Sequence, residues 1–144
     1  MTNRFTRLVH LRRLREEALG GEYARTLAQV RDLHGRMHDL EEQTLQGERD
    51  ARDGLSDVER PPTALIDGFA RGQAFRRKRL ELEINQAQAA SDRARTVWLS
   101  ARTQLQQAEK LSDRAENERR KEMFRKEYRE LDMAGVVRHH RQGE

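Results

Sequence analysis

The sequence contains no cysteine, only two prolines and few aromatic residues, which make up 5% of its 144 residues. Without cysteine, the chain has no disulfide, no thiolate nucleophile and no cysteine-ligated metal. Because prolines and aromatic residues are so scarce, it fits neither a Pro-rich disordered linker nor a β-sandwich. These absences leave helix as the expected secondary structure.

Long apolar runs are missing as well. The opening residues, MTNRFTRLVHLRRLREE, are interrupted by arginine every few positions, whereas a secretory signal has an apolar core. Nowhere do about 18 apolar residues follow one another, as a membrane span requires. We therefore expect a soluble, cytoplasmic protein with no segment inserted in a membrane.

Charge is what the sequence has in abundance. Hydrophobic residues make up 35% of the chain and charged residues 38%, against about a quarter charged in ordinary globular domains. A broad hydrophobic core is therefore not expected. The 29 Lys and Arg are interleaved with the 25 Asp and Glu, so their fields largely cancel beyond about 8–10 Å. The net charge of +4 supports only a modest preference for acidic surfaces.

One stretch breaks the helical pattern. Residues 53–72 contain Pro61 and Pro62 together with three glycines, and two adjacent prolines cannot lie inside a helix because each lacks the N–H donor and clashes with the preceding turn. The sequence therefore predicts one coiled-coil domain over 1–144, with a first helix over about 4–58, a hinge over about 59–63, a second helix over about 64–138 and a flexible tail over 139–144.

Both predicted helices carry a heptad pattern, in which positions a and d face a partner helix. In the first helix the two sets are Tyr23, Val30, Met37, Thr44, Ala51 and Val58, and Leu19, Thr26, Leu33, Leu40 and Gly47. In the second they are Ile84, Ser91, Trp98, Leu105 and Ser112, and Ala87, Ala94, Ala101, Ala108 and Ala115. Alanine at five successive heptads predicts two helix axes that approach closely along a narrow seam.

A short loop between two such helices favours an antiparallel hairpin. Counting outward from Pro61 places Leu40 near residue 84 and Leu8 near residue 116, so the first helix ends before the second. The predicted fold is all-α: an antiparallel two-helix coiled-coil hairpin whose longer second helix overhangs. Its charged stretch AEKLSDRAENERRKEMFRKEYRELD, residues 108–132, forms the end away from the hinge.

Gly20 and Gly21, adjacent inside the first helix, indicate either a tolerated kink or a hinge.

No catalytic or cofactor site emerges from the sequence. His34 and His38 are spaced for a helical metal pair, but two ligands do not hold a catalytic zinc and no acid has the spacing of the zinc-protease motif. We expect no metal, no cofactor and no enzyme activity. The basic cluster RRKRL at 76–80 is followed by Glu81 and Glu83, which makes it a weak candidate for nucleic-acid binding.

Three stretches together resemble a known family: NRFTRLVHLRRLREE at the start, LIDGFARGQAF after the hinge and EKLSDRAENERRKEMFRKEYRELDMAG near the end. In order, spacing and length they are similar to the FliJ family of flagellar export proteins, and more distantly to the YscO-type proteins of virulence secretion. The resemblance covers nearly the whole chain.

The resemblance implies a function. Proteins of this family are antiparallel coiled coils, similar to the central stalk of rotary ATP synthases, that join the hexameric export ATPase to the membrane export gate and escort unloaded export chaperones. It implies that this chain lies at the inner-membrane export apparatus. The predicted hairpin itself leads us to expect a monomer or weak dimer, and the weak basic cluster leads us to expect no nucleic-acid partner.

The same resemblance assigns residues to the two partners. Phe5, Leu8, Leu131 and Asp132 mark the ATPase end, and Phe69 takes the place of a gate-contacting phenylalanine. The apolar positions that follow it in the family are Gln73 and Arg76 here. Either the gate contact is rearranged, or Phe75 and Leu80 take it over.

Two other functions remain open from the residues alone. A generic coiled-coil scaffold would self-associate into longer bundles. A nucleic-acid binder would use the cluster at 76–79 and show steeply salt-dependent DNA binding.

Overall fold

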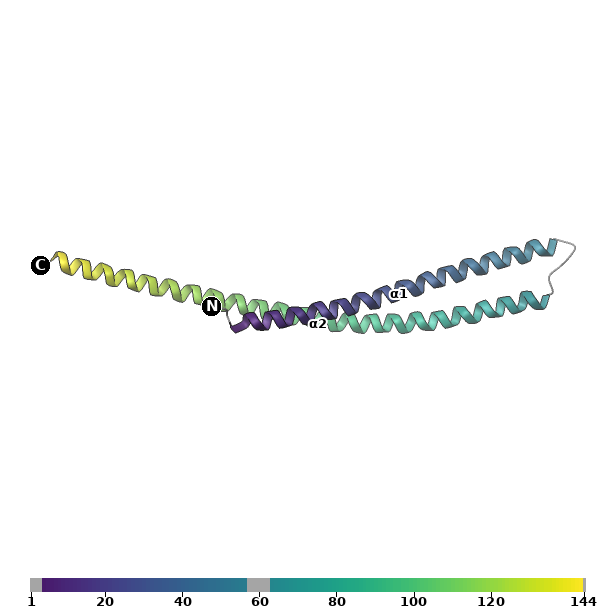
Figure 1. The fold of residues 1–144 in the computed structure, drawn as a ribbon, viewed down its shortest axis with the longest axis horizontal. Helices are drawn as coiled ribbons and strands as arrows, with labels where there is room; N and C mark the ends of the chain where they lie inside the picture. Colours follow the sequence, from purple (N-terminus) through teal and green to yellow (C-terminus); the bar gives the residue numbers. More distant parts are fainter. Residues whose placement is uncertain (1–3, 57–62, 144) are drawn as a thin grey trace. The chain divides into compact units, whose positions relative to one another are not determined.

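The computed structural model describes residues 4–56 and 63–143, and all of their side chains except those of 55 and 56. They form two helices, α1 over Arg4–Ser56 and α2 over Thr63–Gln142, and the described residues contain no strand. The helices pack against each other in antiparallel directions (Figure 1). The predicted all-α, two-helix hairpin is confirmed.

The helix bounds differ slightly from the predicted ones. The twin prolines and most of the predicted hinge lie outside the described residues, and α2 begins at Thr63. At its other end α2 runs to Gln142, four residues past the predicted limit. Arg141 lies in its last turn, and positive charge there interacts favourably with the helix dipole. The tail that we expected to be flexible is therefore helical through Gln142.

The chain divides into two compact units, each with contacts from both helices. The central unit spans Ala18–Trp98, and the terminal unit combines the described residues up to Glu17 with those from Leu99 onward. In neither helix do the described residues contain a stretch long and apolar enough to cross a membrane.

The core of the central unit is a single narrow stripe. Val30 and Leu33 of α1 cluster with Ala87 of α2, and Leu80 and Ile84 pack against them half-buried. Outside this cluster, Ser91 is 1% exposed. The buried seam on α2 thus runs through the small side chains of Ala87 and Ser91, at heptad positions that the sequence predicts.

In the terminal unit, α1 covers only part of α2. Ala101 and Ala108 are buried at 4% and 3% exposure, and Arg13 pairs with Glu109 at 3.3 Å. From Glu116 to Gly143, every described residue is exposed, so the predicted overhang of the second helix is present.

The structure buries the predicted heptad positions. Every described member of the four sets is buried or half-buried, and Val58 lies outside the described residues. The predicted register, however, is wrong by about one heptad in the central unit: Leu40 was placed near residue 84, whereas its neighbour Glu41 pairs with Arg77 at 3.7 Å. Counting outward from the prolines assumed that the two helices are paired symmetrically about them, and the heptad pattern cannot correct that assumption because it repeats every seven residues.

Gly20 serves packing in the central unit. A Cβ atom at Gly20 would lie 3.0 Å from Nε1 of Trp98, and the indole stacks on Tyr23 with ring centroids 5.5 Å apart. Gly20 therefore makes room for the indole. A Cβ at Gly21 would meet nothing within 4 Å, and α1 is helical through both glycines.

Candidate functional site

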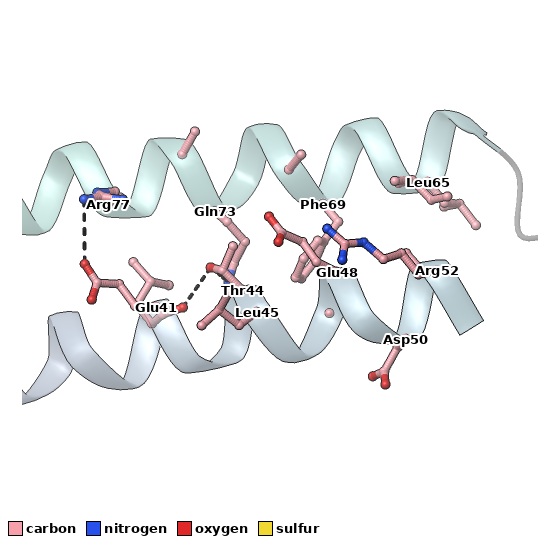
Figure 2. Close-up of a pocket in the computed structure, with 16 residues that line it drawn as sticks. Glu41, Thr44, Leu45, Glu48, Asp50, Arg52, Leu65, Phe69, Gln73 and Arg77 are labelled. Atoms are coloured by element: carbon pink, nitrogen blue, oxygen red, sulfur yellow. Dashed lines mark hydrogen bonds and ion pairs between the residues drawn. The ribbon is translucent and has the colours of Figure 1, made fainter. Parts of the chain in front are cut away.

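The central unit carries a groove between α1 and α2, close to the described ends that flank the connecting segment (Figure 2). Its volume is about 950 Å³. The floor and walls are mainly apolar, and Leu45 and Leu65 are exposed at 53% and 67%. The residues that line it are Leu40, Glu41, Thr44, Leu45, Gly47, Glu48, Asp50, Ala51, Arg52, Leu65, Ile66, Phe69, Ala70, Gln73, Ala74 and Arg77.

The aromatic ring of Phe69 lies in this groove and points from α2 toward α1 (Figure 2). A Cβ atom at Gly47 would come within 2.4 Å of Cζ of Phe69, far inside van der Waals contact. Only glycine at 47 lets the ring lie so close to α1. Phe69 nevertheless remains 42% exposed, so the ring fills part of the seam and also presents a face to solvent.

A polar layer of Gln73 and Thr44 crosses the groove between Phe69 and the pair of Glu41 with Arg77 (Figure 2). The Gln73 side chain is 5% exposed, and its Nε2 donates to Oγ1 of Thr44 at 3.0 Å (Figure 2). The Thr44 hydroxyl donates in turn to the Leu40 carbonyl at 2.8 Å, and Oε1 of Gln73 accepts from Arg76 at 3.1 Å. The buried amide thus has partners at both ends.

The three residues assigned to the gate lie in different surroundings. Phe69 and Leu80 face α1, and Leu80 packs half-buried against the core cluster. Phe75 is 68% exposed and lies about 120° around the helix from Phe69, since consecutive helical residues are about 100° apart. The structure therefore does not bring Phe75 together with Phe69 and Leu80 on one face.

Gly47→Ala is expected to move the Phe69 ring out of the seam without weakening the helix. Alanine favours helix over glycine by about 1 kcal/mol, and this gain is offset by the lost packing of the ring. We expect the free energy of unfolding to change by less than about 0.5 kcal/mol. Denaturant unfolding gives the stability, and NMR signals of the Phe69 ring report its displacement.

Gly35→Ala is the matched control, because a Cβ atom at Gly35 would meet nothing within 4 Å. This change should stabilise the protein by about 0.5–1 kcal/mol. Equal stabilisation by both substitutions, with unshifted Phe69 signals, would show that the close contact at Gly47 is unimportant.

A second candidate surface lies on the overhanging part of α2 in the terminal unit. Phe124, Tyr128 and Leu131, here called the outer stripe, are exposed at 61%, 70% and 69%. Their spacing of four and three residues places them on one helical face. In the heptad frame of α2 they occupy the outer positions c and f, whereas the seam positions continue through Met133 and Val136. The outer stripe thus faces away from the side of α2 that packs on α1.

The four residues assigned to the ATPase end do not form one cluster. Phe5 and Leu8 are half-buried, and the Arg4 guanidinium lies 4.8 Å from the centroid of the Phe5 ring. Leu131 is 69% exposed and Asp132 is exposed too. Leu131 and Asp132 lie roughly 24 Å along α2 beyond Ala115, the last half-buried residue of α2, at about 1.5 Å per residue.

Sequence reasoning missed several residues of these two surfaces. From the sequence, Gly47 is only an imperfectly filled seam position, and Gln73 is only a departure from the family pattern. Phe124 and Tyr128 lie within the charged stretch, and the sequence analysis assigns them to no surface. Their spacing to Leu131 and their absence from the a and d sets are nevertheless visible in the sequence. The contact of Gly47 with Phe69 depends on the register, which the sequence did not specify.

Two of the four cations in the basic cluster pair with carboxylates of their own helix. Arg77 and Arg79 pair along their own helix with Glu81 and Glu83, at 3.2 and 3.5 Å. His38 lies 3.5 Å from Glu42. Within the described residues no group of three or more His, Cys, Asp or Glu could hold a metal ion.

The family model described as flagellar FliJ protein matches residues 1–144, the whole chain. No curated protein and no solved structure matches it.

Proposed function

The chain belongs to the FliJ family and is thus a component of the flagellar export apparatus, and we propose that it acts there as a stalk and adaptor. In this proposal it links and activates the export ATPase hexamer, contacts the cytoplasmic domain of the membrane export gate and escorts export chaperones. It works by contact, without catalysing a reaction, as a cytoplasmic protein at the periphery of the inner membrane.

The observation that carries the proposal is the overhang of α2. From Glu116 to Gly143 this part of the helix is exposed along its whole described length, yet it bears the aromatic and leucine side chains of the outer stripe. Large apolar side chains grouped on one uncovered face are typical of protein contacts. We assign this face, with Leu131 and Asp132, to the ATPase.

The charge around the overhang fits a contact that can be exchanged. Arg120 pairs with Glu116, and Lys121 with Glu118, at 3.6 and 3.0 Å, and all four side chains are more than half exposed. Exposed pairs of this kind contribute roughly 0–1 kcal/mol each. They support an isolated helix and also offer weak, replaceable partners to the charged side chains of a ring of ATPase subunits.

We assign the groove around Phe69 to the export gate. The ring is anchored at Gly47 but keeps 42% of its surface exposed, and exposed apolar side chains of Leu45 and Leu65 extend the same surface. Leu80 would support this surface from the core, because it packs against the cluster of Val30, Leu33 and Ala87. Phe75, on another face, would contact a different part of the gate.

The test uses the purified chain with its cognate export ATPase and the cytoplasmic domain of the gate protein. Wild type should raise ATP hydrolysis and oligomerisation of the ATPase and bind the gate domain. Phe69→Ala should weaken gate binding by about tenfold, the loss of about 1.4 kcal/mol, and leave ATPase stimulation intact. Leu131→Ala or Leu8→Ala should do the reverse.

The proposal fails if saturating wild-type protein leaves both ATPase activity and oligomerisation unchanged. Circular dichroism of each variant must show wild-type helicity. Loss of both functions in every variant would indicate unfolding and would remove the assignment of separate surfaces. In sedimentation experiments the protein should be a monomer or weak dimer. Large bundles would instead indicate a scaffold.

A further inference from the structure

The alanine seam leaves the register of the two helices undetermined. Alanine recurs at the same seam position every seven residues of α2, so sliding α1 along α2 by one heptad again places an alanine at each such position. The Phe69 contact does not separate the two registers either, because Gly54 follows Gly47 after seven residues. The shifted register, with Met37 opposite Ala87, is the one that counting from the prolines predicts.

The polar layer distinguishes the two registers. In the observed one, the buried amide of Gln73 donates to Thr44 at 3.0 Å. One heptad away the residue in the place of Thr44 is Ala51, which has no side-chain acceptor. A buried amide that loses its partner destabilises a protein by about 1–3 kcal/mol, and a single polar seam residue is known to specify register in coiled coils.

Trp98 distinguishes them again at the other end of the central unit. Its indole lies against Gly20, where an added Cβ would be 3.0 Å from Nε1, and stacks on Tyr23. One heptad away the residue in the place of Gly20 is Leu27, whose side chain would occupy the space of the indole. Trp98 therefore fits only the observed register.

We infer that Gln73 with Thr44, and Trp98 with Gly20, set the register of α1 on α2 in the central unit, which the alanine seam and the Phe69 contact leave open. Gln73 is thus a positioning residue: it determines that Phe69 meets Gly47 and which residues of α1 surround the ring. The register itself is independent of any partner. Its consequence for gate binding rests on the proposed function.

Cysteine cross-linking tests the inference in a chain that has no cysteine of its own. Val30→Cys with Ala87→Cys reports the observed register, and Met37→Cys with Ala87→Cys reports the shifted one, each joined by a short bismaleimide. In wild type the first pair should react and the second should not. In Gln73→Leu/Trp98→Leu the yield of the second pair should rise at least tenfold, because two registers become similar in stability.

A relocation variant makes the test sharper. Thr44→Ala and Ala51→Thr, combined with Trp98→Leu, move the acceptor for Gln73 by one heptad. The second cysteine pair should then become the dominant product, which a merely destabilising substitution does not produce. Gln88→Leu is the matched control, because Gln88 is exposed and bonds to Asp92 on its own helix, and its yields should match wild type.

Both variants must keep wild-type helicity, measured by circular dichroism. If the double leucine variant loses helix, the relocation variant decides. A second-pair yield that stays at the wild-type level in every helical variant, or helix loss in both, overturns the inference. None of these measurements involves ATPase or gate, so they stand apart from the test of the proposed function.

Discussion

Replacing Phe124, Tyr128 and Leu131 together by alanine is expected to abolish most of the stimulation of the export ATPase, at least tenfold at subsaturating protein. The three side chains form one exposed face, and aromatic residues often dominate the binding energy of protein contacts. Because none of them packs on α1, the free energy of unfolding should change by less than about 0.5 kcal/mol. ATP hydrolysis titrated with the variant, and denaturant unfolding, measure the two effects.

The control uses the opposite, seam-side face of the same helix segment. Met133, Val136 and Val137 are exposed at 69%, 60% and 52%, and their joint replacement by alanine removes apolar side chains without altering the outer stripe. This control should keep most of the stimulation. If it loses as much activity as the first variant, the overhang contributes general hydrophobicity and not a defined face.

Leu33→Ala is expected to lower the free energy of unfolding by about 2–5 kcal/mol, the usual range for a buried leucine. Leu33 is 5% exposed and belongs to the core cluster found among the described residues of the central unit. Since the core is a single stripe, few other contacts compensate for the lost side chain. Chemical denaturation followed by circular dichroism at 222 nm provides the measurement.

Leu11→Ala is the corresponding control, with the same change at a side chain of α1 that is 54% exposed. It should alter stability by less than about 0.5 kcal/mol. Equal destabilisation by the two substitutions would contradict a stability concentrated in the narrow seam.

The heptad positions were predictable because they depend on local periodicity. Val30, Leu33 and Ala87 recur at spacings that the sequence displays directly, and all three are buried. The family was also accessible from the sequence, since the match covers residues 1–144. The end of α2 was less predictable from the sequence. The polar residues after Arg138 were expected to be flexible, yet they continue the helix to Gln142.

The outer stripe shows where periodicity alone falls short. Phe124, Tyr128 and Leu131 share a face in any helix, so their grouping follows from the sequence. Whether another helix covers that face depends on where α1 starts along α2. Only the packed structure shows that all described residues from Glu116 to Gly143 are exposed.

The sequence by itself determined that this chain forms two long helices with one apolar stripe each, because heptad spacing and the twin prolines act within a few turns of chain. The tertiary structure alone decided which residues of the two stripes meet. A pattern that repeats every seven residues is unchanged by a shift of seven, so it cannot distinguish Leu40 near residue 84 from Glu41 paired with Arg77. Contacts that do not repeat, Gln73 with Thr44 and Trp98 with Gly20, appear only when the helices are packed together.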